Sequence, residues 1–231
     1  MGSPLPPAVR GKTLPSGPQS RTTADTRTTL LAGTRIGKGG QRMSYQNLFP
    51  IHVIAKRTGS SRQFLHWALQ MLNIQPYQHL LEIGYGAGHL TEEVARTLRI
   101  GFVAGIGPSV TSYRQAYRRN RRFISQQLLQ LHIGETSELS YPPHYFHTIY
   151  GNNIHLSWKD IYAELLRLTG LLRHKGRLVL LIEATRDQPD VKTTALRLRE
   201  ACFNAGLKEV YTEQHRTMPD SHMALIAHKI L

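Results

Sequence analysis

Three glycines alternate with other residues at the end of a short apolar run, in the stretch LEIGYGAG from Leu81 to Gly88. A strand that ends in closely spaced glycines lets the backbone approach a ligand, and the helix that follows offers free N–H groups. The spacing is E-x-G-x-G-x-G, whereas a dinucleotide fingerprint requires G-x-G-x-x-G, and counting from Gly84 that pattern fails at His89. The loop predicts a ligand site, and the residues downstream have to identify the ligand.

Histidines and the single cysteine are the other residues that could carry chemistry. His155, three residues beyond Asn152, is a candidate general base because histidine titrates near neutral pH, and a plain loop histidine is the alternative. His144 and His147 have no third ligand nearby in the sequence, so no metal site is predicted. Cys202 lies in a helical pattern that predicts a small buried side chain rather than a reactive thiol.

Positive charge is concentrated in two places, within a formal net charge of +14. Residues 1–42 contain seven Lys or Arg and one acid in a Gly-, Pro-, Ser- and Thr-rich segment, which predicts a disordered basic tail. Three interpretations of this tail are open: upstream sequence before a working start at Met43, a transit peptide, or an anion-binding arm. The second group is an arginine cluster that predicts either a solvated helix face or a grip on nucleic acid or an acidic substrate; it comprises Arg114, Arg118, Arg119, Arg121 and Arg122.

Strands and helices alternate along residues 43–231, which we expect to form one domain. Apolar periodicity predicts helices at 60–73, 109–122, 158–173 and 190–205, and a further helix with Leu90, Val94 and Leu98 inward. Predicted strands are 79–84, 102–106, 128–133, 146–152, 177–184, 208–216 and 222–230. This order predicts an α/β, doubly wound, Rossmann-like sheet of seven strands that ends in a hairpin with an antiparallel last strand.

No uninterrupted apolar run approaches the roughly 18 to 20 residues that span a bilayer. We therefore expect a soluble, cytoplasmic protein without a membrane span, with organelle import through the basic tail as the alternative. Nothing in the sequence predicts the oligomeric state.

Beyond the glycine loop, residues 60–231 resemble the class I S-adenosylmethionine-dependent methyltransferases, in particular small-molecule enzymes similar to those of quinone biosynthesis. Five motifs carry the resemblance in order: Glu82 to Gly88, Gly105 to Ser109, His132 to Pro142, Phe146 to Asn153, and Leu171 to Leu178. What the resemblance implies is binding of S-adenosylmethionine and methyl transfer to a small-molecule acceptor. The loop after strand four is Gly-Asn-Asn-Ile-His and lacks the Pro-Pro type associated with base N-methylation.

The resemblance also implies a role for individual residues. The backbone of Gly84, Tyr85 and Gly86, in the loop that Gly88 ends, would line the methionine end of the cofactor. The ring of Tyr85 would either stack over the cofactor or cover the end of the following helix. Glu82 would help to hold the cofactor's ammonium. The remaining implied contacts are Gly107, Pro108 and Ser109 by the ribose, Glu135 and Thr136 by the adenine, and Asn152 and Asn153 facing the sulfonium and the acceptor.

Two positions depart from the family pattern. Gly107 stands where the family usually has a carboxylate that binds both ribose hydroxyls, and His147 stands where it usually has Asp. A hydrogen bond to a charged group contributes roughly 1.5–3 kcal/mol, so the missing carboxylate predicts cofactor binding weaker by about tenfold to a hundredfold. A methyltransferase-like protein that binds a ligand or partner with weak or no catalysis is therefore the alternative function.

Overall fold

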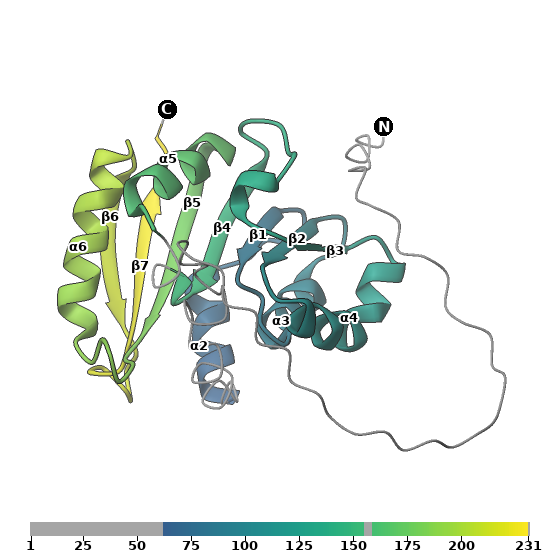
Figure 1. The fold of residues 1–231 in the computed structure, drawn as a ribbon, viewed down its shortest axis with the longest axis horizontal. Helices are drawn as coiled ribbons and strands as arrows, with labels where there is room; N and C mark the ends of the chain where they lie inside the picture. Colours follow the sequence, from purple (N-terminus) through teal and green to yellow (C-terminus); the bar gives the residue numbers. More distant parts are fainter. Residues whose placement is uncertain (1–61, 155–158, 231) are drawn as a thin grey trace, which may run out of the picture. The chain divides into compact units, whose positions relative to one another are not determined.

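Seven strands form one sheet in the computed structural model, which describes residues 62–154 and 159–230 (Figure 1). The strand order is β3-β2-β1-β4-β5-β7-β6. The first five strands pair in parallel, and β7 is antiparallel to both of its neighbours. The strands are β1 (His79–Ile83), β2 (Phe102–Gly107), β3 (Leu129–Ile133), β4 (Phe146–Asn152), β5 (Leu172–Glu183), β6 (Lys208–Gln214) and β7 (His222–His228). The predicted doubly wound sheet with its antiparallel last strand is confirmed.

Helices cover both faces of this sheet (Figure 1). On one face lie α2 (Arg62–Leu72), α3 (His89–Thr97) and α4 (Val110–Ser125). On the other face lie α5 (Ile161–Leu171) and α6 (Val191–Asn204), and a single 3₁₀ turn, η2 (Thr136–Glu138), follows β3. Asp160 and Asp190 cap α5 and α6 by accepting hydrogen bonds from backbone N–H groups of the first turn.

The core lies on both faces of the central strands because their sequences are apolar on both sides. Leu178, Leu180 and Ile182 of β5 face α5 and α6, and Val179 and Leu181 face α2. A strand that is buried on both faces is typical of a sheet with helices on each side. Cys202 is buried within α6, as predicted, and burial raises the pKa of its thiol to about 12.

The junction between α5 and β5 differs from the prediction. A helix through residue 173 and a strand from 177 were expected, but α5 ends at Leu171 and β5 begins at Leu172. Leu172 pairs with Phe146 of β4, and the register then shifts before the pairing of Thr148 with Arg177. Pairing with the first residue of β4 therefore overrides the helix propensity of the residues between Leu172 and Arg177.

Parts of the chain lie outside the described residues, namely the expected tail at 1–42, the following 43–61, and 155–158. The predicted domain boundary and the candidate base His155 fall within them. Within the described residues, the structure contains no helix whose length and apolar content would allow it to cross a membrane.

Candidate functional site

The glycine loop joins β1 to α3 beside the point where the strand order reverses, since β1 lies between β2 and β4. Ligands of doubly wound sheets bind at this point, outside the carboxyl ends of the strands. Gly84, Gly86 and Gly88 all have left-handed backbone conformations, with φ of 73°, 50° and 77°. Residues with a Cβ rarely adopt these backbone angles, which explains why the loop has glycine at all three positions.

The three glycines differ in what surrounds them. A Cβ added to Gly86 would meet no atom within 4 Å, whereas one on Gly88 would lie 2.6 Å from Nδ2 of Asn120 and 2.9 Å from Ala116. The buried Asn120 donates hydrogen bonds to the carbonyls of Gly88 and Ala116, and thereby fixes the loop against α4. Gly88 is thus required for close packing, and Gly86 presents its backbone to open space.

Glu82 lies beneath the loop and is 4% exposed. Its Oε2 accepts a hydrogen bond of 3.0 Å from the hydroxyl of Tyr150 on β4. Burial raises the pKa of Glu82 to about 7, although the neighbouring hydroxyls of Thr91 and Tyr150 act to lower it. This carboxyl group is close to half-ionised at neutral pH, and a nearby cation would favour its ionised form. That is the behaviour expected of a residue that helps to hold an ammonium.

Tyr85 fills the position next to the missing carboxylate. Its ring lies on β2, because a Cβ added to Gly107 would stand 3.4 Å from Cε1 of the ring and one added to Gly105 would stand 2.9 Å from Cδ1. The Tyr85 hydroxyl donates a 2.9 Å hydrogen bond to the carbonyl of His132 on β3. The side chain is 4% exposed, and burial raises its pKa. The two glycines of β2 therefore accommodate the ring of Tyr85.

The segment after β2 contributes a helix cap. Ser109 is the N-cap of α4, and its hydroxyl accepts a hydrogen bond of 3.2 Å from the backbone N–H of Ser112. Pro108 is exposed. The predicted ribose-side residues thus lie together at the end of β2, but the described residues of this segment present no carboxylate there.

The two predicted adenine-side residues are held by local hydrogen bonds. Glu135 is the exposed N-cap of η2 and forms a reciprocal capping box with Glu138. Thr136 is buried, and its hydroxyl donates a 2.5 Å hydrogen bond to Oε2 of Glu164 on α5. Both residues lie at the carboxyl end of β3, on the same edge of the sheet as the glycine loop.

The two asparagines after β4 have different environments. Asn153 donates from Nδ2 to the carbonyl of Glu183 and accepts from its backbone N–H, at 3.0 and 2.8 Å. Its amide therefore joins the ends of β4 and β5. The Oδ1 atom of Asn152 is buried without a hydrogen-bond partner among the described residues.

Ile154 packs against the start of the glycine loop. Its Cγ2 would lie 3.3 Å from a Cβ on Gly84 and 2.6 Å from one on Gly151. The side chain is 4% exposed. Glycine at these two positions makes room for an apolar side chain between the ends of β1 and β4.

An additional acid–base pair, which the sequence analysis did not identify, lies at the carboxyl end of β5. Glu183 and His222 are cross-strand partners in the antiparallel pairing of β5 with β7, and Oε1 lies 3.8 Å from Nε2. The Nδ1 atom of His222 lies 2.9 Å from the hydroxyl of Ser221. Burial lowers the pKa of His222, while the charge of Glu183 acts to raise it. The residues are 39 positions apart, so only the strand register brings them together.

Aromatic rings from α2 adjoin this pair. The ring of Phe64 is centred 5.7 Å from that of His222, and the ring of Trp67 lies 5.2 Å from that of His215. The helical spacing of Phe64 and Trp67 predicted an apolar face, but their contact with two histidines depends on where α2 crosses the sheet.

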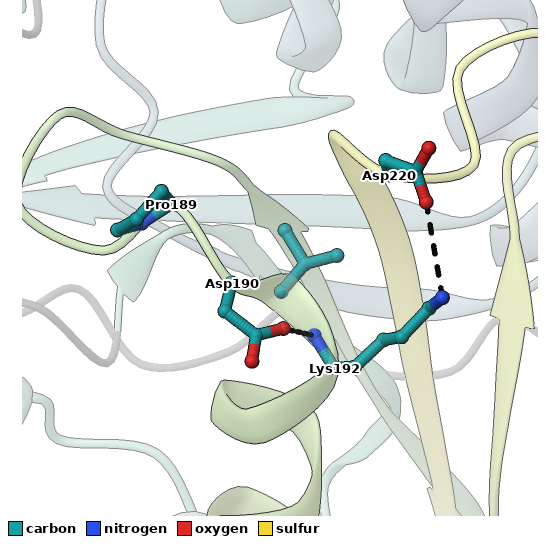
Figure 2. A pocket seen from close by; sticks show the side chains of 5 residues that line it. Pro189, Asp190, Lys192 and Asp220 are labelled. Carbon is teal, nitrogen blue, oxygen red and sulfur yellow. Dashed lines mark hydrogen bonds and ion pairs between the residues drawn. The ribbon is translucent and has the colours of Figure 1, made fainter.

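Two cavities lined by described residues lie away from the glycine loop. The first is at the start of α6, with Pro189, Asp190, Val191, Lys192 and Asp220 around it (Figure 2). Its charged groups have structural partners: Asp190 accepts from the backbone N–H of Lys192, and the Lys192 ammonium lies 3.8 Å from Asp220. The second cavity lies at the amino ends of β1 and β4 and is treated below.

Solved structures of low sequence identity share this architecture. A SAM-dependent methyltransferase from Aquifex aeolicus superposes with a TM-score of 0.61 at 13% identity, over 72% of this chain and 89% of its own. Phosphoethanolamine N-methyltransferase 2 of Haemonchus contortus, solved with S-adenosylhomocysteine, gives 0.58 at 13% identity, over 72% of this chain and 52% of its own. The fold is that of a class I S-adenosylmethionine-dependent methyltransferase.

Sequence comparison gives one curated relative of this class. YrhH of Bacillus subtilis (strain 168), provisionally named a methyltransferase, is 24% identical over 138 residues, which is 60% of this chain and 75% of YrhH. No family model matches the chain. The methyltransferase fold also occurs in the [4+2]-cyclase SpnF, with a TM-score of 0.61 at 15% identity, over 73% of this chain and 81% of SpnF. The fold alone therefore does not determine the reaction.

The residues around the glycine loop fit S-adenosylmethionine unevenly. At the predicted methionine end, Gly86 faces open space and the raised pKa of Glu82 favours a cationic neighbour. At the predicted ribose end, Gly107 supplies no carboxylate, and the ring of Tyr85 lies in van der Waals contact with the position where such a side chain would begin. The described residues fit the amino-acid part of the cofactor better than its ribose.

Proposed function

We propose that this protein binds S-adenosylmethionine at the loop from Gly84 to Gly88 and transfers a methyl group to a small-molecule acceptor. The observation that supports this most is the conformation of the loop, in which three left-handed glycines lie at the strand-order switch directly above the buried Glu82. Relatives and fold neighbours of the methyltransferase class support the same function.

S-adenosylmethionine, when bound, supplies an electrophilic methyl group, so the protein's main tasks are to align the acceptor and to exclude water. The backbone at Gly86 would approach the amino-acid end of the ligand, and Glu82 would balance its ammonium. Tyr150 holds the Glu82 carboxyl in place through its hydroxyl. The buried Oδ1 of Asn152 is an acceptor for a ligand donor beyond β4.

An acceptor would approach from the carboxyl ends of β4 and β5, where Asn153 joins the two strands. If that acceptor has a proton to lose, Glu183 and His222 are a second candidate base pair besides His155. Oε1 of Glu183 lies 3.8 Å from Nε2 of His222, so the charge of the carboxylate would stabilise the protonated ring after His222 had accepted a proton.

A second candidate is a ligand-binding protein without methyl transfer, and the contact between Tyr85 and Gly107 favours it. The ring occupies space beside the ribose position and the carboxylate is absent, so affinity for the adenosine part of the cofactor would fall. The [4+2]-cyclase with this fold is a precedent for another reaction on the same scaffold.

Calorimetric titration with S-adenosylmethionine and S-adenosylhomocysteine tests the proposal. The methyltransferase function predicts saturable binding of both, together with slow demethylation of the cofactor when a mixture of small acceptors is supplied. Binding without turnover over a broad acceptor set would favour the second candidate. Absence of any binding at millimolar ligand would refute cofactor binding in both its forms.

A further inference from the structure

A second cluster of chemically active side chains lies at the opposite edge of the sheet from the glycine loop. A cavity of about 380 Å³ opens at the amino ends of β1 and β4 and the start of β5. Six residues line it: His79, His144, Tyr145, His147, Arg173 and His174. Four are histidines and one is an arginine, and none of these six described residues is an Asp or Glu.

Hydrogen-bond donors outnumber acceptors at His147. The backbone N–H of His79 points at Nδ1 over 3.1 Å, and a guanidinium nitrogen of Arg173 lies 2.6 Å from Nε2. A neutral imidazole has a single acceptor nitrogen, and an imidazolium has none. Both donors therefore cannot be satisfied by the ring at the same time.

A buried ammonium adjoins the same cavity. Lys229 is 7% exposed, and its Nζ donates to the carbonyls of Thr169 and Leu172 at 2.7 and 3.0 Å. Nδ1 of His144, which lines the cavity, lies 2.9 Å from the same Nζ. None of these three partners is a carboxylate, and no ion pair joins Lys229 or Arg173 to a carboxylate among the residues that the structure describes.

We propose that this cavity is a binding site for a phosphate-type dianion, such as a phosphate monoester. A tetrahedral oxyanion supplies several acceptors in one place, and a guanidinium fork binds it through paired charge-assisted hydrogen bonds. A bound cation is disfavoured because Arg173 is permanently charged and exposed at the mouth. The site is separate from the glycine loop, so it does not depend on the proposed methyltransferase function.

Binding at this site would be coupled to a proton. The groups that face His147 are Arg173 from β5, His79 from β1, and Tyr77 from the segment before β1. Burial, followed by the charges of Arg173 and His79, lowers the pKa of His147 to about 4, so its ring is neutral at pH 7. An anion that binds the guanidinium of Arg173 would draw it away from Nε2 of His147, and this nitrogen could then accept a proton. Phosphate should therefore raise the pKa of His147, and its dianionic form should bind more tightly as the pH falls.

Calorimetric titration of the whole protein with inorganic phosphate at constant ionic strength tests the site. We expect saturable binding that is at least about tenfold tighter for phosphate than for acetate, because acetate carries half the charge and fewer acceptors. Arg173→Gln should weaken phosphate binding about tenfold or more. Arg186→Gln removes an exposed arginine in the loop after β5 and is the matched control, which should leave binding unchanged.

Histidine NMR titrations of the wild-type protein give a readout that does not depend on any variant folding. Phosphate should move the midpoint of the His147 ring signals to higher pH, and His147→Asn should remove that signal and lower the proton uptake on binding. Equal affinities for phosphate and acetate, equal losses in the two arginine variants, or an unmoved His147 midpoint would each overturn the proposal.

Discussion

The ring of Tyr85 lies against Gly107, so closely that a Cβ at this glycine would stand 3.4 Å from Cε1. This distance is an ordinary van der Waals contact, and Gly107 is not among the glycines with positive φ. The backbone at Gly107 would thus accept a side chain even though the chain places none there. The carboxylate is absent because residue 107 is glycine, and the backbone conformation at this position would allow an aspartate.

Gly107→Asp should therefore raise the affinity for S-adenosylmethionine by about tenfold or more, which corresponds to roughly 1.4 kcal/mol. The reason is that a carboxylate at the end of β2 would accept hydrogen bonds from both ribose hydroxyls. Calorimetry on the folded variant measures the gain. Gly107→Asn is the matched control, because the amide has the same shape without the charge.

A cofactor without the 2′-hydroxyl separates ribose recognition from a general charge effect. It should bind the wild-type protein about as well as the parent compound and should lose most of the advantage of the Asp variant. A well-folded Gly107→Asp protein that binds no more tightly would show that another residue already holds the ribose, or that the pocket rejects this cofactor.

Gly86→Ala tests whether the loop is the ligand site. Gly206, after α6, is a matched position, because it also has a positive φ and a Cβ there would also meet no atom within 4 Å. Alanine at either position should cost about 1–2 kcal/mol of unfolding free energy through backbone strain. Affinity for S-adenosylmethionine should fall only in the Gly86 variant, where the methyl group enters the space that the ligand approaches.

Urea denaturation of both variants, followed by titration of the folded proteins, measures the two effects separately. Unchanged affinity in a folded Gly86→Ala protein would place the ligand elsewhere. An equal loss of affinity in Gly206→Ala would mean that stability, and not contact, controls binding.

Much of the sheet was predictable because each strand and helix has a clear apolar period. β4 was predicted at its observed bounds, and Leu90, Val94 and Leu98 of the helix after the loop are buried as expected. The loop glycines were recognisable because their spacing is local. The contact of Tyr85 with β2 was not predictable, since it depends on the parallel register of β1 and β2, 23 residues apart at Ile83 and Ile106.

The sequence does contain a signal for that contact in retrospect. Gly105 and Gly107 are two apart in one strand, so both lack a side chain on the same face of the sheet, beside an aromatic residue in the neighbouring loop. The pairing of Glu183 with His222 has no such local signal, because it requires the antiparallel register of the last strands. The roles of Glu135, Thr136 and Asn152 toward a cofactor, and of His155 as a general base, stay predictions.

Glu82→Gln should change how stability depends on pH. The pKa of Glu82 is about 7 in the folded protein against an ordinary value of 4.5, so the folded state binds more protons between these two values. The wild-type protein should therefore lose stability as the pH rises from about 4.5 to 7, by up to about 3 kcal/mol. Glutamine keeps an oxygen acceptor for Tyr150 but cannot ionise, which removes this loss.

Urea midpoints of wild type and Glu82→Gln at several pH values between 4.5 and 7.5 measure the difference. The free energy of unfolding of Glu82→Gln should rise relative to that of the wild-type protein as the pH increases from about 4.5 to 7, and the difference should level off above that range. A difference that does not vary with pH would contradict the raised pKa of the buried carboxyl.

Gly105→Ala and Gly107→Ala form the most direct test of where the Tyr85 ring lies. A Cβ at Gly105 would stand 2.9 Å from both Cδ1 of Tyr85 and Cδ2 of Leu131, which should destabilise the protein by about 1–3 kcal/mol through overpacking. Gly107→Ala meets the ring at 3.4 Å and should be neutral or slightly stabilising, because alanine restricts the unfolded chain.

The cost at Gly105 should depend on the ring itself. In a Tyr85→Leu background the penalty of Gly105→Ala should shrink by about 1 kcal/mol, since residues in contact are energetically coupled. Unfolding free energies of the four proteins in this double-mutant cycle measure the coupling. A penalty that is the same in both backgrounds would assign the clash to Leu131 alone and would mean that Tyr85 does not occupy the face of β2 in solution.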